Sequence, residues 1–106
     1  MALDVYIVNP ETDEAVYQFG IEDEAHAVVF TDEYMMTRAC PQLLKAQEYF
    51  DDAKFSGFEL ECIVRGIDKA LPRFTGRADA MAMLRQLRAA CAEADRSDRY
   101  IQMRGD

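Results

Sequence analysis

Apolar and polar residues alternate near both ends of the chain, which predicts short β-strands there. Residues 4–8 form a β-branched and aromatic run, residues 9–14 supply turn formers, and residues 15–20 form a second apolar run. Two such runs joined by a short polar turn are typical of a β-hairpin. Residues 99–104 alternate again, so the sequence predicts a closing strand that can pair with the first strand.

Apolar residues recur at helical spacing in the second half of the chain. Residues 58–71 place them three, four, seven and eleven positions apart, and Ser56 with Glu59 matches the capping box that opens many helices. The same stretch also alternates over residues 58–65, so a strand there remains an alternative. Residues 78–94 are rich in alanine, leucine, methionine, glutamine and arginine, and they predict the clearest helix of the chain.

The segment before this helical region has a less regular pattern. The β-branched residues among positions 25–30 favour a third strand, although the alanines there also permit a helix. Thr31 or Asp32 can cap a short helix over residues 33–38. A further helical segment is predicted to begin at Pro41 and to extend through residues 42–52, because proline is well tolerated in the first turn of a helix.

Together these elements predict an α+β fold. A small antiparallel sheet, made of the N-terminal hairpin and the C-terminal strand, packs on three or four helices. The chain has 106 residues, half of them hydrophobic, so we expect one domain over residues 1–106. The longest uninterrupted apolar runs are only a few residues, far short of the roughly 20 that a membrane-spanning helix needs.

The charges are strongly polarised along the chain. The first 37 residues contain nine acidic residues and no lysine or arginine. Residues 1–61 carry a formal charge of −11 from fourteen acidic and three basic residues, whereas residues 62–106 carry +3 from six acidic and nine basic ones, for a total of −8. Such a distribution predicts a negative field that attracts cationic partners and repels nucleic acid and anionic lipid.

The sequence therefore predicts a protein-binding surface built from carboxylates. These carboxylates are expected to pair with lysine or arginine side chains of a basic protein partner. Aromatic residues such as Tyr17, Tyr34, Tyr49 and Phe50 are expected to supply the central contact energy. The predicted contact set is Glu22, Asp23, Glu24, Asp32, Glu33, Asp51 and Asp52.

The sequence gives no support for catalysis, a cofactor or a metal site. His26 is the one histidine, and no partner for it is visible in the sequence. Cys40, Cys62 and Cys91 are odd in number and widely spaced, so we expect buried, reduced thiols rather than metal ligands or disulfides. Glycine-rich phosphate loops are absent, and a sequence pI near 4.6 argues against nucleic-acid binding by the arginines. We expect a non-enzyme with no cofactor.

In general character the chain resembles the small cytoplasmic immunity proteins that bacteria make against polymorphic or contact-delivered toxins. The likeness rests on compact size, the α+β pattern, the lack of catalytic motifs and the acidic runs at residues 22–24, 32–33 and 51–52. The resemblance implies a tight, stoichiometric complex with a basic toxin or nuclease domain. It implies a cytoplasmic protein, and the N-terminal Met1-Ala2-Leu3-Asp4, which lacks the features of a secretory signal, agrees with this.

Two other functions stay open at this level. One is a self-associating structural or regulatory protein, a homodimer for example, that uses the edge of the hairpin or a methionine-bearing helix. Methionines most often fill cores, but Met36 and Met83 are candidates for an adaptable contact surface. The other is a small enzyme whose site combines His26 with distant carboxylates and arginines, which is the least favoured of the three.

Overall fold

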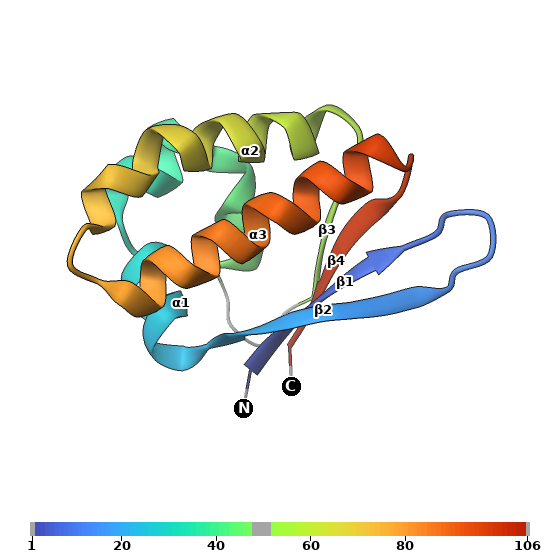
Figure 1. Cartoon of the computed structure of the whole chain (residues 1–106), viewed down its shortest axis with the longest axis horizontal. Coiled ribbons are helices and arrows are strands. Elements are labelled where there is room, and N and C mark those ends of the chain that lie inside the picture. The colour runs from blue at the N-terminus through green and yellow to red at the C-terminus, as the bar shows by residue number, and fades with distance from the viewer. Residues whose placement is uncertain (1, 48–51, 106) are drawn as a thin grey trace.

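The computed structural model describes residues 2–47 and 52–105 (Figure 1). Helices and strands follow one another along the chain without a repeating order. In chain order they are β1 (Ala2–Val8), β2 (Ala15–Glu22), α1 (Asp23–Val29), η1 (Met35–Ala39), η2 (Pro41–Ala46), β3 (Ala53–Phe55), α2 (Phe58–Ala70), η3 (Leu71–Phe74), α3 (Ala78–Arg96) and β4 (Tyr100–Arg104).

The strands form one antiparallel sheet with the order β2-β1-β4-β3. The predicted hairpin is confirmed, and so is the pairing of the closing strand with the first strand, in which Ile7 lies opposite Ile101. The short strand β3 was not predicted from the sequence. It pairs with the other side of β4. Strand β2 therefore forms one edge of the sheet, and its register with β1 contains a bulge at Gln18.

The helices α2 and α3 lie on the same side of the sheet (Figure 1), where α3 packs on β1, β2 and β4 and α2 packs on α3. Because side chains alternate along a strand, Leu3, Val5 and Ile7 of β1 point into this layer and are buried. The α+β fold class is as predicted. The helix predicted over residues 78–94 is also confirmed, and its inner face is completely buried at Ala80, Leu84, Leu87, Cys91 and Ala94.

Residues 25–30 do not form the predicted strand. Residues 25–29 belong to α1, which ends at Val29, and Phe30 follows as its C-cap residue. The buried positions of this segment are Ala25, His26, Val29 and Phe30, and their spacing of three and four residues places them on one helical face. Packing of that face against the core therefore outweighs the strand preference of the β-branched side chains.

The strand alternative for residues 58–65 is also wrong, because they belong to α2. An alternating strand would bury Phe58 on the same side as Leu60, but Phe58 is 70% exposed. One half of the predicted capping box is present. The Ser56 backbone N–H donates to Oε1 of Glu59 at 3.3 Å, and Gly57 has the positive φ of 57° that precedes the helix.

The region between α1 and β3 is helical in short, tight pieces. Asp32 caps the first of them as predicted, since its Oδ1 accepts the Met35 backbone N–H at 2.9 Å. The π-helical turn η1 ends at Ala39, and Pro41 begins the 3₁₀ segment η2 as expected. The helix predicted through residues 42–52 is seen only as far as Ala46, and part of its remainder lies outside the described residues. Over the ranges 2–47 and 52–105, no helix is long and apolar enough to cross a lipid bilayer.

Candidate functional site

The early acidic residues keep most of their charge uncompensated after folding. Of the nine acidic residues in the first 37 positions, only Asp32 makes an ion pair within the described part of the chain. Four of the nine basic residues in the second half instead pair with acids that are also in the second half or close to its start. These pairs are Arg65 with Glu61, Arg77 with Asp79, Arg88 with Asp68, and Arg96 with Glu93.

The pairing of Arg88 with Asp68 uses one of the later arginines within the helical layer. Both nitrogens Nε and NH2 of Arg88 donate to the Asp68 carboxylate, at 2.6 and 3.0 Å, and so tie α3 to α2. This hydrogen bonding, with the attraction between the charges, lowers the pKa of Asp68. Other cations lie over aromatic rings: Lys54 over Tyr100 and Arg104 over Tyr6.

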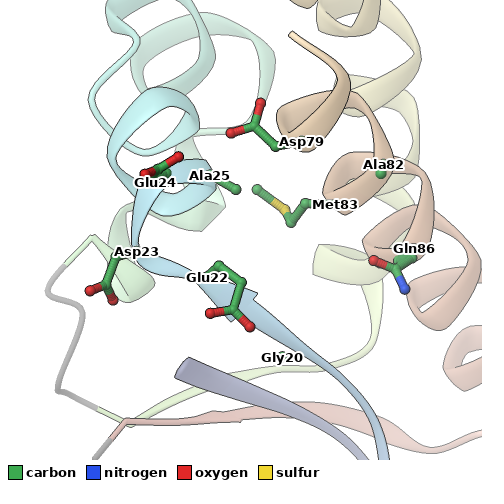
Figure 2. Close-up of a pocket in the computed structure, with 9 residues that line it drawn as sticks. All are labelled: Gly20, Glu22, Asp23, Glu24, Ala25, Asp79, Ala82, Met83 and Gln86. Carbon is green, nitrogen blue, oxygen red and sulfur yellow. The ribbon is translucent and has the colours of Figure 1, made fainter. Parts of the chain in front are cut away.

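Three of the predicted contact residues lie together where β2 passes into α1. Glu22 ends the strand, and Asp23 and Glu24 form the first turn of the helix, where acidic side chains favour the helix dipole. All three are exposed, and they line one cavity of about 540 Å³. The cavity lies between this corner and α3, and its lining is drawn in Figure 2: Gly20, Glu22, Asp23, Glu24, Ala25, Asp79, Ala82, Met83 and Gln86.

Asp79 adds a fourth carboxylate to this cavity, and the sequence analysis missed it. It is in the first turn of α3, and its Oδ1 accepts the Ala80 backbone N–H at 2.8 Å. The Arg77 side chain lies 3.7 Å from the same oxygen, so Asp79 is partly compensated. An acidic residue at the start of a helix is common, and nothing local in the sequence connects position 79 with positions 22–24.

The floor of the cavity is apolar. Met83 reaches from α3 toward Ala25 on α1, and Glu22 and Asp79 lie on opposite sides of this contact (Figure 2). Met83 and Ala25 are both buried. Of the two methionines singled out from the sequence, Met83 therefore lines the site, whereas Met36 belongs to the core. The arrangement offers carboxylates around a small apolar surface, which suits a cationic group carried on an aliphatic stem.

Asp32 and Glu33 lie away from this cavity. Asp32 is bound to Arg73, with 3.2 Å between its Oδ2 and NH2 of the arginine, and the same guanidinium lies over the Tyr34 ring. Glu33 lines a separate depression of about 280 Å³ together with Tyr34, Thr37, Arg38 and Arg73. The charges of this second location are mixed, so it does not extend the acidic cavity.

The last two predicted contact residues are also separate. Asp52 directly precedes β3, and its Oδ1 accepts the Gly105 backbone N–H at 3.2 Å. Asp51 lies outside the described residues, as do Tyr49 and Phe50. The structure thus brings Glu22, Asp23 and Glu24 together and adds Asp79, while Asp32, Glu33 and Asp52 are placed elsewhere.

His26 has a structural position next to the site. It is 7% exposed, its ring stacks on Phe30 at 4.4 Å, and its Nε2–H donates to the Ala46 carbonyl at 2.8 Å. This bond ties α1 to η2. The ring therefore supports the helix that presents Asp23 and Glu24, and it faces the interior rather than the cavity.

The cysteines are free, and two of the three are buried. Burial is the main cause that raises the pKa of both Cys40 and Cys91 to about 12. Because the thiolate is the reactive form, we expect maleimide at pH 8 to modify Cys62, which is partly exposed, at least about 100-fold faster than the other two. Mass spectrometry of peptides from briefly labelled native protein measures this. Equal labelling of all three thiols in the native protein would contradict the expectation, and unfolded protein serves as the control.

The comparisons with known proteins do not bear on this site. Comparison of the chain with protein-family models, with curated proteins and with solved structures finds no match. In the part of the chain that the structure describes, no group of three or more His, Cys, Asp or Glu side chains is arranged to hold a metal ion.

Proposed function

We propose that this protein is an acidic protein-binding module that neutralises a basic partner by stoichiometric binding. The partner class is a basic toxin or nuclease domain, as the likeness to cytoplasmic immunity proteins implies. The observation that carries the proposal is the cavity in which Glu22, Asp23 and Glu24 meet Asp79, the first three without an ion pair among the described residues.

Several physical arguments support this role. A carboxylate that makes no ion pair within its own protein can bind a lysine or arginine of another protein without the free-energy cost of breaking an existing ion pair. The net charge of −8 accelerates association with a cationic surface, and that acceleration weakens as salt is added. Nuclease active sites are cationic because they hold phosphates, so an acidic module can cover such a site.

The test uses the full chain as bait for proteins of the source cell, with two charge-reversed variants. The site variant carries Glu22→Lys, Asp23→Lys and Glu24→Lys. Each reversed charge is expected to cost about 1 kcal/mol of binding free energy at an exposed contact. The three together are expected to weaken binding to the basic partner about 100-fold. Isothermal titration calorimetry with the purified partner measures the loss, and the partner is expected to be a basic protein that binds at a ratio of one to one.

A matched control has the same change in net charge at a different place. It carries Glu11→Lys, Asp13→Lys and Glu14→Lys in the exposed hairpin loop. Because long-range steering changes equally in both variants, the control is expected to retain most of the affinity. Equal losses in the two variants would show that net charge alone matters, and recovery of no basic partner by the native chain would overturn the proposal.

A further inference from the structure

Strand β2 forms one edge of the sheet and is longer and less charged than most edge strands. It is eight residues long, and residues 15–21 carry no charged side chain and no proline. Val16 and Tyr17 are 45% and 55% exposed. Natural edge strands are commonly short, or they carry lysine or proline, because every second residue of an edge directs its backbone N–H and C=O away from the sheet. Here the bulge at Gln18 interrupts the edge.

A groove runs between this strand and α3. The acidic cavity and a second hollow of about 240 Å³ lie next to each other there, and Gln86 lines both; the two together are called the groove. The second hollow is lined by Gln18, Phe19, Gln86, Ala89 and Ala90. The α3 residues that line the groove share one face of the helix, at positions 79, 82, 83, 86, 89 and 90.

The groove has the length of a short extended segment. Eleven residues of α3 separate its ends, which corresponds to about 16 Å, or about five residues of extended chain. Ala82 and Ala89 are exposed on the helix side, and Gly20 lies on the strand side, so small residues leave the space open. Recognition modules that bind peptides between an edge strand and a helix use this combination: backbone pairing gives affinity, and alternate side chains enter the groove.

The two ends of the groove differ in charge. Glu22, Glu24 and Asp79 lie at the end near α1, whereas the residues that line the second hollow are all uncharged. We infer that the groove binds an extended peptide segment of the basic partner, which adds to the edge of β2 and places a lysine or arginine among these three carboxylates. The inference rests on the proposed function and specifies the element of the partner that is recognised.

The direction of the bound segment follows from the sheet. All strand pairs of the sheet are antiparallel, and β2 runs toward its acidic end at Glu22. An antiparallel segment therefore begins at the acidic end, with its basic residue first and small β-branched or apolar residues after it. A suitable probe is the peptide acetyl-Lys-Arg-Thr-Val-Thr-Val-Thr-amide, which is soluble and has a high strand preference.

Binding of this peptide to the full chain is measured by fluorescence anisotropy. Replacing its Lys-Arg pair by Glu-Glu is expected to weaken binding at least tenfold, because the three carboxylates Glu22, Glu24 and Asp79 then meet like charges. N-methylation of the Thr and Val amides keeps every side chain but removes the donors for strand pairing, and it is expected to weaken binding at least tenfold as well.

The variant Ala89→Phe fills the uncharged end of the groove. Ala89 is exposed, so we expect the fold to tolerate the larger side chain, and circular dichroism checks this. Ala78→Phe is the matched control on an exposed position of the same helix that does not line the groove. The affinity of Ala89→Phe for the peptide is expected to fall at least tenfold, whereas Ala78→Phe is expected to bind the peptide as tightly as the native chain does.

Each result separates this inference from the proposed function. If a basic partner is captured through Glu22, Asp23 and Glu24 but Ala89→Phe and peptide N-methylation change nothing, the inference is overturned and the proposed function stands. Equal binding of the Glu-Glu peptide would overturn the role of the acidic end. A dimer of the native chain in sedimentation that Ala89→Phe dissociates would assign the groove to β2 of a second copy instead, and would also overturn the inference.

Discussion

Replacing Gly66 with alanine is expected to destabilise the protein by about 3 kcal/mol or more. Gly66 is buried in α2 where the helix touches η1. A Cβ atom at this position would lie 2.1 Å from the Ala39 carbonyl oxygen and 2.3 Å from Sγ of Cys40. Both distances are far below van der Waals contact, and the oxygen belongs to the backbone, so the helix and the turn would have to separate.

The sign of this effect distinguishes it from the usual behaviour of glycine in helices. In an exposed helix interior, a change from glycine to alanine stabilises by about 1 kcal/mol. At Gly66 the steric clash outweighs that gain. Urea denaturation measures the free energy of unfolding, with Lys69→Ala as the control because Lys69 is exposed in the same helix. The control is expected to change stability by about 0.5 kcal/mol or less. A Gly66→Ala variant as stable as the native chain would show that α2 and η1 do not touch in solution.

Replacing Phe30 with alanine is expected to cost about 3 to 5 kcal/mol. The Phe30 side chain is completely buried and stacks on His26, and the Phe30 backbone carbonyl accepts the Gln47 side-chain amide at 3.2 Å. Truncation removes apolar contact area and leaves a cavity beneath α1, the helix that presents Asp23 and Glu24. We therefore expect weaker partner binding at temperatures where the native chain is still folded.

Phe58 provides the matched control for this prediction. The same change, Phe58→Ala, removes a ring that is 70% exposed at the start of α2. It is expected to alter the free energy of unfolding by about 0.5 kcal/mol or less. Thermal denaturation of both variants gives the comparison. Similar losses for the two would mean that Phe30 does not occupy the core, and that α1 is held in another way.

Several elements followed from local sequence alone. The hairpin, the closing strand and the helix over residues 78–94 rest on periodicity and on intrinsic preference, and both act over a few neighbouring residues. The structure has all three, with the last extended to Arg96. The segment of residues 25–30 was predicted wrongly because its local preference opposed its packing. Strand β3 has three residues, too few for a pattern, and it exists because β4 offers it a free edge.

The candidate site shows the same division. Glu22, Asp23 and Glu24 are neighbours in the chain, so their grouping could be read from the sequence. Asp79 joins them from 55 or more positions away, and Arg73 compensates Asp32 across 41 positions. Both contacts depend on how the helices pack on the sheet. No spacing rule for helices or strands reaches over such separations.

The sequence by itself determined the fold class, most of the secondary structure and the concentration of negative charge in the first half of the chain. Those properties depend on composition and on short-range periodicity. Only the tertiary structure decided which carboxylates remain unpaired, that residues 23–29 are helical, and that a groove follows the edge of β2. These depend on which surfaces meet, because burial of apolar area and pairing of charge are settled between elements that are distant in the chain.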